Sequence, residues 1–171
     1  MTHNAARKAG YKVGTDFEKK FVEKYGGELV TDKALQYKDI DVILPDGTTV
    51  SVKNQTKGSG KSGNISLELR QFNTKSGKDT PGNFVLCEAD LLAIAVTYCD
   101  EQQWLLLDKK DFNSWIDKWV DIDKGWLKKT LTPWTIEINR KENRFFDNAE
   151  NLLIPIHVVA KRFRGSLEFL E

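Results

Sequence analysis

Apolar and polar residues follow two different spacings along the first part of the chain. Residues 15–25 carry their apolar side chains at helical spacing, and the pair Gly26-Gly27 ends this predicted helix. Residues 38–44 and 49–54 instead alternate between apolar and polar side chains, which is typical of β-strands. Because the sequence Pro-Asp-Gly-Thr between these two segments has turn composition, they are predicted to form a hairpin.

The rest of the chain continues this mixture of helical and extended patterns. Residues 65–72 are predicted to form a helix because Leu69 and Phe72 are spaced to face a core. A later amphipathic segment predicts a helix capped by Asp108 or Asp111. Pro155 indicates that part of the last predicted strand is an edge or a bulge. The remaining predictions are strands at residues 91–98, 103–107, 134–140 and 152–159 and the amphipathic helix at residues 111–120.

This order of elements predicts a mixed α/β fold with a central sheet flanked by helices. A length of 171 residues favours one domain, since single domains cluster near about 100–150 residues. Within it, residues 1–14 are expected to be flexible and residues 121–171 to add carboxy-terminal strands to the core. Hydrophobic residues make up 40% of the chain and aromatic residues 11%, which excludes a wholly disordered protein.

Composition also bears on where the protein works. No apolar run approaches the roughly 20 residues that span a bilayer, and the amino terminus lacks the apolar stretch of a signal peptide. Cys87 and Cys99 are too few for a disulfide framework. We therefore expect a protein of the reducing cytoplasm that is neither secreted nor membrane-spanning.

Positive charge is concentrated in one stretch although the net charge of the chain is only +1. Residues 53–78 contain six basic side chains and a single acid, Glu68. The stretch is also rich in glycine and small polar residues, so its simplest interpretation is a solvated surface loop. If a catalytic site lies beside it, the basic residues are expected to contact the phosphates of DNA. Those expected to do so are Lys57, Lys61, Arg70, Lys75 and Lys78.

The predicted hairpin brings acids and a lysine together. Side chains alternate between the two faces of a strand, so Asp39 and Asp41 share one face of the first strand. On the return strand Ser51, Lys53 and Gln55 share the polar face. A lysine in a strand with an apolar pattern requires a nearby anion, which the aspartates or a phosphate would supply.

This arrangement resembles the PD-(D/E)XK nuclease superfamily, whose core has an aspartate on one strand and an acid-x-lysine pair on the next. The matching residues are Asp41 and Lys53, with Glu18 on the preceding helix. The resemblance extends from residue 15 to residue 119 and implies a restriction-endonuclease-like core. It further implies an enzyme that hydrolyses DNA phosphodiester bonds with Mg²⁺ or Mn²⁺, in which carboxylates hold the cation and the lysine helps to activate water.

The sequence departs from this pattern at one position. Two residues before the lysine, the second acid is replaced by Ser51, and a hydroxyl is a weak ligand for Mg²⁺. Some restriction endonucleases of the superfamily with this substitution supply the missing carboxylate from the helix that follows. Glu68, 15 residues after Lys53 in the predicted helix, is the candidate for that role. Gln55 resembles the polar residue that touches the phosphate or orders the site.

Each candidate also has a structural interpretation. Asp41 would pair with a lysine at the surface, Lys53 would protect a strand edge from aggregation, and Glu18 would complete a capping box with Thr15. Asp39 is expected to be a solvent-facing neighbour, and Glu68 has an alternative as an ordinary surface glutamate.

Three functional hypotheses follow from these observations. The first is a metal-dependent DNA endonuclease with metal ligands Asp41, Glu68 and Glu18, in which Lys53 orients or deprotonates water. The second is an inactive nucleic-acid-binding or assembly module on the same scaffold. The third is a structure-selective junction resolvase, since small members of the superfamily with a basic face often act as homodimers.

Overall fold

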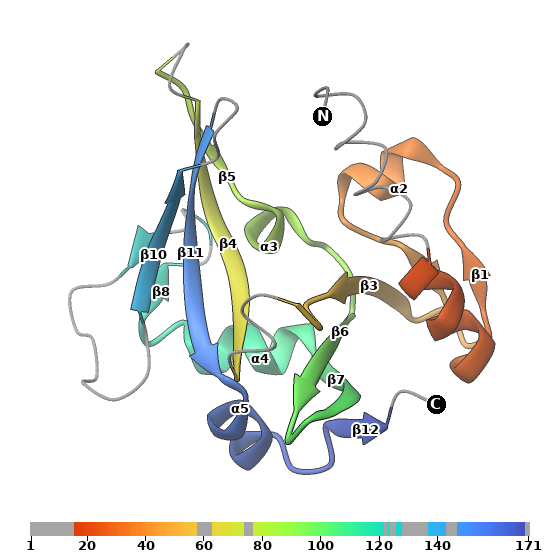
Figure 1. Cartoon of the computed structure of the whole chain (residues 1–171). Helices are drawn as coiled ribbons and strands as arrows, with labels where there is room; N and C mark the ends of the chain where they lie inside the picture. The colour runs from red at the N-terminus through yellow and green to blue at the C-terminus, as the bar shows by residue number, and fades with distance from the viewer. Residues whose placement is uncertain are drawn as a thin grey trace, which may run out of the picture.

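Two β-sheets with helices packed around them make up the described part of the chain (Figure 1). The structure is a computed structural model, and it describes residues 16–57, 63–73, 77–121, 123, 126–127, 137–142 and 147–169. The predictions for residues 1–14 and for Lys61 and Lys75 lie outside these residues. The predicted mixed α/β class is confirmed.

The first sheet is mixed. Its strand order is β1-β2-β3-β6-β7-β12, with only β3 and β6 running parallel to each other among these neighbouring pairs. The strands are β1 (Glu28–Leu29), β2 (Val42–Ile43), β3 (Thr49–Asn54), β6 (Leu91–Tyr98), β7 (Glu101–Asp108) and β12 (Leu167–Phe169).

The second sheet is antiparallel and has the order β10-β11-β4-β5. Its strands are β10 (Glu137–Glu142), β11 (Asp147–Pro155), β4 (Asn64–Asn73) and β5 (Asp79–Pro81); β8 (Val120–Asp121) and β9 (Trp126–Leu127) form a separate pair. The helices are a first helix at residues 16–25, α2 (Lys33–Tyr37), α3 (Asn83–Leu86), α4 (Lys109–Ile116) and α5 (Ile156–Arg162). No helix in the described ranges is both long enough and apolar enough to cross a membrane.

Several predicted elements are confirmed. The first helix and β3 lie where the sequence predicts them, and β6 and β7 cover the two apolar runs. The first strand of the hairpin is shorter than predicted, because β2 contains only Val42–Ile43. The helix predicted from residue 111 begins two residues earlier as α4, and the Asp108 side chain caps it by accepting a hydrogen bond from Asp111 N at 2.8 Å.

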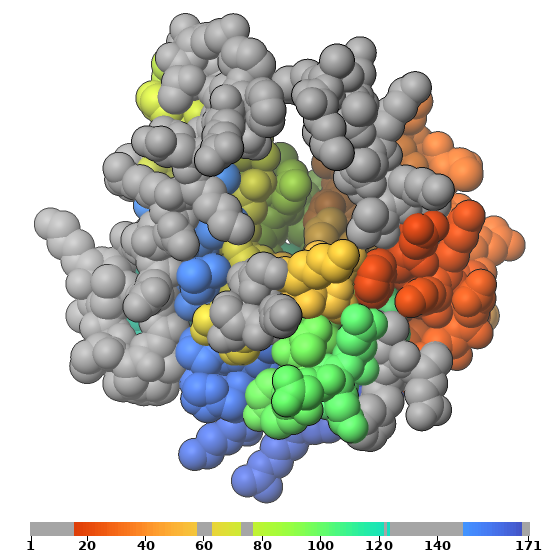
Figure 2. Space-filling view, in the orientation of Figure 1, coloured from red at the N-terminus to blue at the C-terminus, as the bar shows by residue number. Residues whose placement is uncertain are grey.

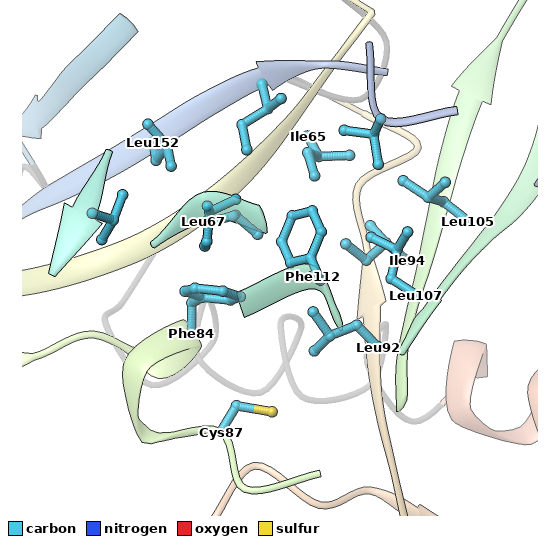
Figure 3. Close-up of a cluster of buried hydrophobic side chains, with 14 of the residues drawn as sticks. Ile65, Leu67, Phe84, Cys87, Leu92, Ile94, Leu105, Leu107, Phe112 and Leu152 are labelled. Carbon is cyan, nitrogen blue, oxygen red and sulfur yellow. The ribbon is translucent and has the colours of Figure 1, made fainter. Parts of the chain in front are cut away.

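The first sheet buries both of its faces. On one face the first helix packs Phe21 against Trp104 of β7, with ring centroids 5.4 Å apart and nearly perpendicular planes. The other face packs toward the second sheet and α4, where side chains of β4, β6, β7 and β11 meet around Phe112 (Figure 3). The site described below lies where β3 enters this space between the two sheets.

The predicted helix at residues 65–72 is wrong, since these residues belong to β4. Ile65, Leu67 and Leu69 are buried in turn while the residues between them are more exposed, so the spacing of burial is two. The sequence prediction relied on Leu69 and Phe72, but Phe72 is 44% exposed. Strand pairing with β11 and β5 fixes the orientation of this segment.

The last predicted strand is correct only in its first half. β11 ends at Pro155, and residues 156–162 form α5, whose Ile156 and Val159 face the core one helical turn apart. β11 as a whole pairs with β10 on one side and β4 on the other, but the described pairing with β10 ends at Leu153, so Pro155 is paired only with Asn64 of β4, in agreement with the expected edge position. Its irregularity falls between Glu150 and Asn151 rather than at the proline.

The strand assignment of β4 can be tested by two substitutions. Leu69→Ala is expected to lower the free energy of unfolding by about 2–5 kcal/mol because it empties a buried position. Phe72→Ala is expected to cost less than about 1 kcal/mol because the ring is largely in solvent. Urea denaturation measures both. Similar large losses for the two variants would favour the helix instead.

Candidate functional site

Lys53 is the centre of a compact charged cluster at the second half of β3. Parallel pairing places Ser51 beside Leu92 and Lys53 beside Ile94 of β6, so both side chains point toward the second sheet. The Lys53 ammonium donates a hydrogen bond to Asp39 Oδ1 and lies 3.7 Å from Asp41 Oδ2. The Lys53 side chain is 33% exposed, so solvent or a ligand can reach it.

Asp39 reaches this cluster from the end of α2 and not from a strand. It follows the helix cap Lys38 and has a left-handed backbone with φ of 58°, while Ile40 N donates to Leu35 O across the turn. The carboxylate accepts a hydrogen bond of 2.9 Å from the buried Ser51 hydroxyl in addition to that from Lys53. The expectation that Asp39 faces solvent is therefore wrong.

Asp41 is held against the backbone of β3. Its Oδ2 accepts a hydrogen bond of 2.8 Å from Val52 N, and its side chain is 19% exposed. Burial raises the pKa of Asp41, and the neighbouring charge of Lys53 and the Val52 hydrogen bond offset only part of that rise. The contacts with Lys53 and Val52 N therefore do not fully offset the cost of burying the ionised Asp41 carboxylate.

Glu18 approaches Asp41 from the first helix, which covers the opposite face of the sheet. Burial raises the pKa of Glu18 and repulsion from Asp41 raises it further, while Lys53 lowers it. These interactions bring Glu18, Asp41 and Lys53 into one electrostatic cluster. The capping-box alternative involves Thr15, which lies outside the described residues.

Lys53 remains a cation in this setting. Burial lowers its pKa, but the charges of Asp39 and Asp41 together with the Asp39 hydrogen bond outweigh that effect, and the pKa of Lys53 is raised overall. An amine with a raised pKa holds its proton at neutral pH. Lys53 is thus suited to stabilising negative charge and poorly suited to removing a proton from water.

A cavity of about 330 Å³ opens beside Lys53 between the two sheets. Asp39, Lys53, Gln55 and Glu68 all line it, whereas Asp41 and Glu18 are not among its described lining residues. The end of β3 reaches the surface between the first helix and β11, where it is coloured amber in Figure 2. The cluster is therefore accessible on this face of the molecule.

Glu68 lies across the cavity from the cluster, on β4 and not on the predicted helix. Its Oε1 accepts hydrogen bonds from Gln71 Nε2 at 2.7 Å and from Asn83 N, at the start of α3, at 3.2 Å. Gly82 allows this close approach, because a Cβ there would lie 2.3 Å from Glu68 O. The carboxylate thus helps to hold α3 on β4, a structural role that the sequence did not indicate.

Gln55 joins the end of β3 to β4. Its Nε2 donates to Ser66 O at 2.7 Å, and its Oε1 accepts from Ser66 N at 2.8 Å. The side-chain amide thus imitates one rung of a β-ladder and fixes the width of the cavity. This geometry supports the ordering role that we considered for Gln55 and occupies the groups that would touch a phosphate.

The basic stretch does not form one continuous patch in the described residues. Lys57 is exposed and lines the cavity. Arg70 lies further along β4, where Nε donates to Asp79 Oδ1 at 3.1 Å and Nη1 lies 3.9 Å from Glu150 Oε2. Lys78 is exposed just before β5. Of the predicted phosphate contacts that are described, only Lys57 is placed beside Lys53.

Two residues next to the cluster were missed by the sequence analysis. Cys87 is buried, its sulfur lies 3.9 Å from Asp39 O, and burial together with the Asp39 charge raises its pKa. Lys109 is also buried, with Nζ 2.9 Å from Asn113 Oδ1 and over the ring of Phe84. Burial lowers the pKa of Lys109. Cys87 lies in a short apolar segment and Lys109 at the start of an amphipathic helix, so neither sequence pattern indicated that these residues would lie next to the charged cluster.

The donor set suits a hard cation that keeps part of its own hydration. In the described ranges, no three Asp, Glu, His or Cys side chains are gathered closely enough to hold a metal by themselves. Mg²⁺ usually takes only one or two carboxylates and completes its octahedron with water and substrate phosphate. Asp41, which lies 3.7 Å from the Lys53 ammonium, and Glu18, whose charge interacts with that of Asp41, are the two carboxylates that could supply this pair.

Comparisons with protein-family models, curated protein sequences and solved structures give no significant match to this chain. The chemistry of the site therefore has to be argued from its own residues.

The raised pKa values predict that Glu18→Gln and Asp41→Asn each stabilise the metal-free protein at pH 7.5. A carboxyl whose folded pKa lies above its unfolded value binds its proton more tightly in the folded chain. The contribution of this tighter proton binding to the stability of the fold is full below the unfolded pKa and is lost as pH rises through the folded pKa. A neutral amide avoids this loss, so Tm should rise by about 1–4 °C.

Differential scanning calorimetry in EDTA measures these changes. Glu88→Gln is the matched control, since Glu88 is an exposed partner of Lys38 at 2.7 Å and should change Tm little. The gain should shrink as the pH falls, because the raised pKa values make the wild-type carboxyls of the folded protein take up protons more readily than unperturbed ones. A fall in Tm for both site variants at pH 7.5 would contradict the electrostatic analysis.

Proposed function

We propose that this protein is a Mg²⁺-dependent endonuclease that hydrolyses phosphodiester bonds of DNA. The observation that carries the proposal is the position of Lys53, a cation held by Asp39 and Asp41 at the mouth of a cavity, with Glu18 beside Asp41. An ammonium held in place by neighbouring carboxylates suits a reaction in which a phosphate gains negative charge.

The carboxylates divide into two groups by their contacts. Asp41 and Glu18 would hold Mg²⁺ or Mn²⁺, because their charges repel each other and are incompletely compensated. When bound, the divalent ion polarises a phosphoryl oxygen and lowers the pKa of a coordinated water. Glu68, proposed from the sequence as a third ligand, is better placed to face the substrate across the cavity.

Asp39 contacts the serine that stands where the second acid of the motif is expected. The serine in the acid-x-lysine position, Ser51, is buried and donates its hydroxyl proton to Asp39 Oδ2. This hydrogen bond and the ion pair with Lys53 fix the carboxylate in one orientation. We assign Asp39 the task of orienting Lys53 and keeping it charged.

Lys53 would act on the phosphate and not as a base. Its raised pKa keeps the ammonium protonated at neutral pH, where it can donate hydrogen bonds to a non-bridging oxygen. Charge stabilisation of this kind in a partly buried site contributes more than it would in open water. Lys57, exposed on the same rim of the cavity, would bind the adjacent phosphate.

The order of elements supports a restriction-endonuclease-like core as part of this proposal. The resemblance noted in the sequence requires a helix glutamate, an aspartate on one strand and a lysine on the next. The first helix carries Glu18, Asp41 directly precedes β2, and Lys53 lies on β3, which pairs antiparallel with β2. The parallel strand β6 then extends the sheet beside the lysine.

Cleavage of DNA tests the proposal directly. Wild-type protein is expected to cut plasmid or oligonucleotide DNA with Mg²⁺ or Mn²⁺ and not in EDTA. Lys53→Met and Asp41→Asn should each lower the rate at saturating DNA by at least about 100-fold, because each removes charge stabilisation of the transition state. Gel analysis of cleavage products measures the rates.

Lys33→Met, at an exposed position on α2, is the matched control and should leave the rate unchanged. Flaps, single strands and four-way junctions offered beside plain duplex would identify a junction resolvase by its preference. Absence of cleavage of every substrate with both ions would contradict the nuclease and favour the binding-module hypothesis.

The phosphate role of Lys57 predicts a specific change in salt dependence. Lys57→Ala should reduce the slope of log K against log salt concentration by about 0.9 for duplex DNA, because one counterion fewer is released. Fluorescence anisotropy in Ca²⁺ between about 50 and 200 mM salt measures the slope. Lys118→Ala, exposed beyond α4, should leave it unaltered. Equal slopes for wild type and Lys57→Ala would remove this residue from the interface.

A further inference from the structure

The proposed function does not say what fills the cavity beside Lys53, which opens directly from the proposed catalytic cluster. We propose that it binds a single unpaired nucleobase, so that the preferred substrate is DNA with an unstacked nucleotide at the site of attack. This inference rests on the proposed function for the identity of the ligand as DNA. It adds the state of the DNA that the site selects.

The walls of the cavity suit the faces of a planar base. Its apolar lining residues are Leu92 and Ile94 of β6, Leu67 of β4 and Phe84 of α3. These four side chains pack around the Phe112 ring in Figure 3 and are at most 5% exposed, so packing fixes their positions and they lie at the buried end of the cavity. Aromatic and aliphatic walls bind any base through its face.

Polar residues that could bind a base edge and basic residues that could bind its phosphate both line the cavity. Both hydrogen bonds that the structure records to the Glu68 carboxylate end on Oε1, which leaves Oε2 to accept an N–H group of a base. Asn83 and Asn151 place side-chain amides on the same lining. Lys53 and Lys57 at the opposite side complement the phosphates of the same nucleotide.

The size of the cavity decides between paired and unpaired DNA. Ligand pockets in proteins range over about 300–1,000 Å³, so a volume of about 330 Å³ belongs to the small end. A double helix cannot enter a space of this size between two sheets. One nucleotide rotated out of its stack can, and the unstacking cost is lowest where the base already lacks a partner.

The test compares three labelled duplexes in Ca²⁺ by fluorescence anisotropy, so that no cleavage is needed. One is fully paired, one carries a single bulged nucleotide, and one carries a bulged abasic residue. The abasic duplex keeps the flexibility of the bulge without its base. Wild-type protein is expected to bind the bulged nucleotide about 10-fold more tightly than the abasic bulge, as stacking of one base is worth about 1–3 kcal/mol.

Two substitutions on α3 locate the effect. Asn83→Trp places a large side chain at the exposed rim of the cavity and should abolish the difference between base and abasic bulge while binding of paired duplex is unchanged. Leu86→Trp, also exposed but away from the cavity lining, should retain the difference. Equal affinity of wild type for the two bulges, or a difference that persists in Asn83→Trp, would overturn the inference.

A second variant keeps the test decisive if Asn83→Trp does not fold. Glu68→Gln retains an oxygen that can accept from Asn83 N but replaces the other carboxylate oxygen by an amide donor. It should reduce the base-dependent difference at least threefold, and an unchanged difference would contradict the proposed rim contact. A base-dependent difference in affinity without any cleavage would support the nucleobase-binding cavity and contradict the proposed nuclease activity. Cleavage without that difference would support the nuclease activity and contradict the nucleobase-binding cavity.

Discussion

The ion pair between Lys53 and Asp39 is the interaction on which the site depends. It joins β3 to the turn after α2, and through the Ser51 hydroxyl it also fixes the orientation of the carboxylate. Asp39 adopts a left-handed backbone there, a conformation that residues other than glycine and asparagine adopt less readily. The helix α2 thus ends in a less favoured backbone conformation, and this conformation places the Asp39 carboxylate against Lys53, the only lysine of β3.

Burial and charge then set the chemistry around this pair. Lys53 keeps its proton because two aspartates outweigh its desolvation. Burial destabilises the anions of Asp41 and Glu18, and repulsion from Asp39 adds to this at Asp41 and repulsion from Asp41 adds to it at Glu18. In the proposed function Lys53 would face a phosphate, and Asp41 and Glu18 would accept a divalent cation. This asymmetry within a few residues is the physical basis for regarding the cluster as functional, since a purely structural ion pair has no need of the extra carboxylates.

The sequence predicted this hairpin well and its surroundings poorly. Alternation of apolar and polar residues correctly placed β3 and brought Lys53 and Asp41 together, because strand periodicity depends on local pattern alone. Alternation also put Asp39 on the face of Asp41, but it missed the ion pair of Asp39 with Lys53, since the direction of Asp39 is set by the helix turn before β2 and not by a strand. The segment at Glu68 was misread because Leu69 and Phe72 fit a helical spacing, while pairing with β11 makes it a strand. The sequence does carry a strand signature here, since Ile65, Leu67 and Leu69 alternate with polar residues, but the helical interpretation gave more weight to Leu69 and Phe72.

The most direct measurement of the central claim is a Mn²⁺ titration followed by NMR of the backbone amides. A paramagnetic ion held by the cluster should broaden the signals of residues around Glu18, Asp41 and Lys53 first, at substoichiometric concentrations. The signals around the surface pair of Lys38 and Glu88 should persist. Broadening that begins elsewhere, with the signals around Glu18 and Asp41 unaffected, would contradict a cation site beside Lys53.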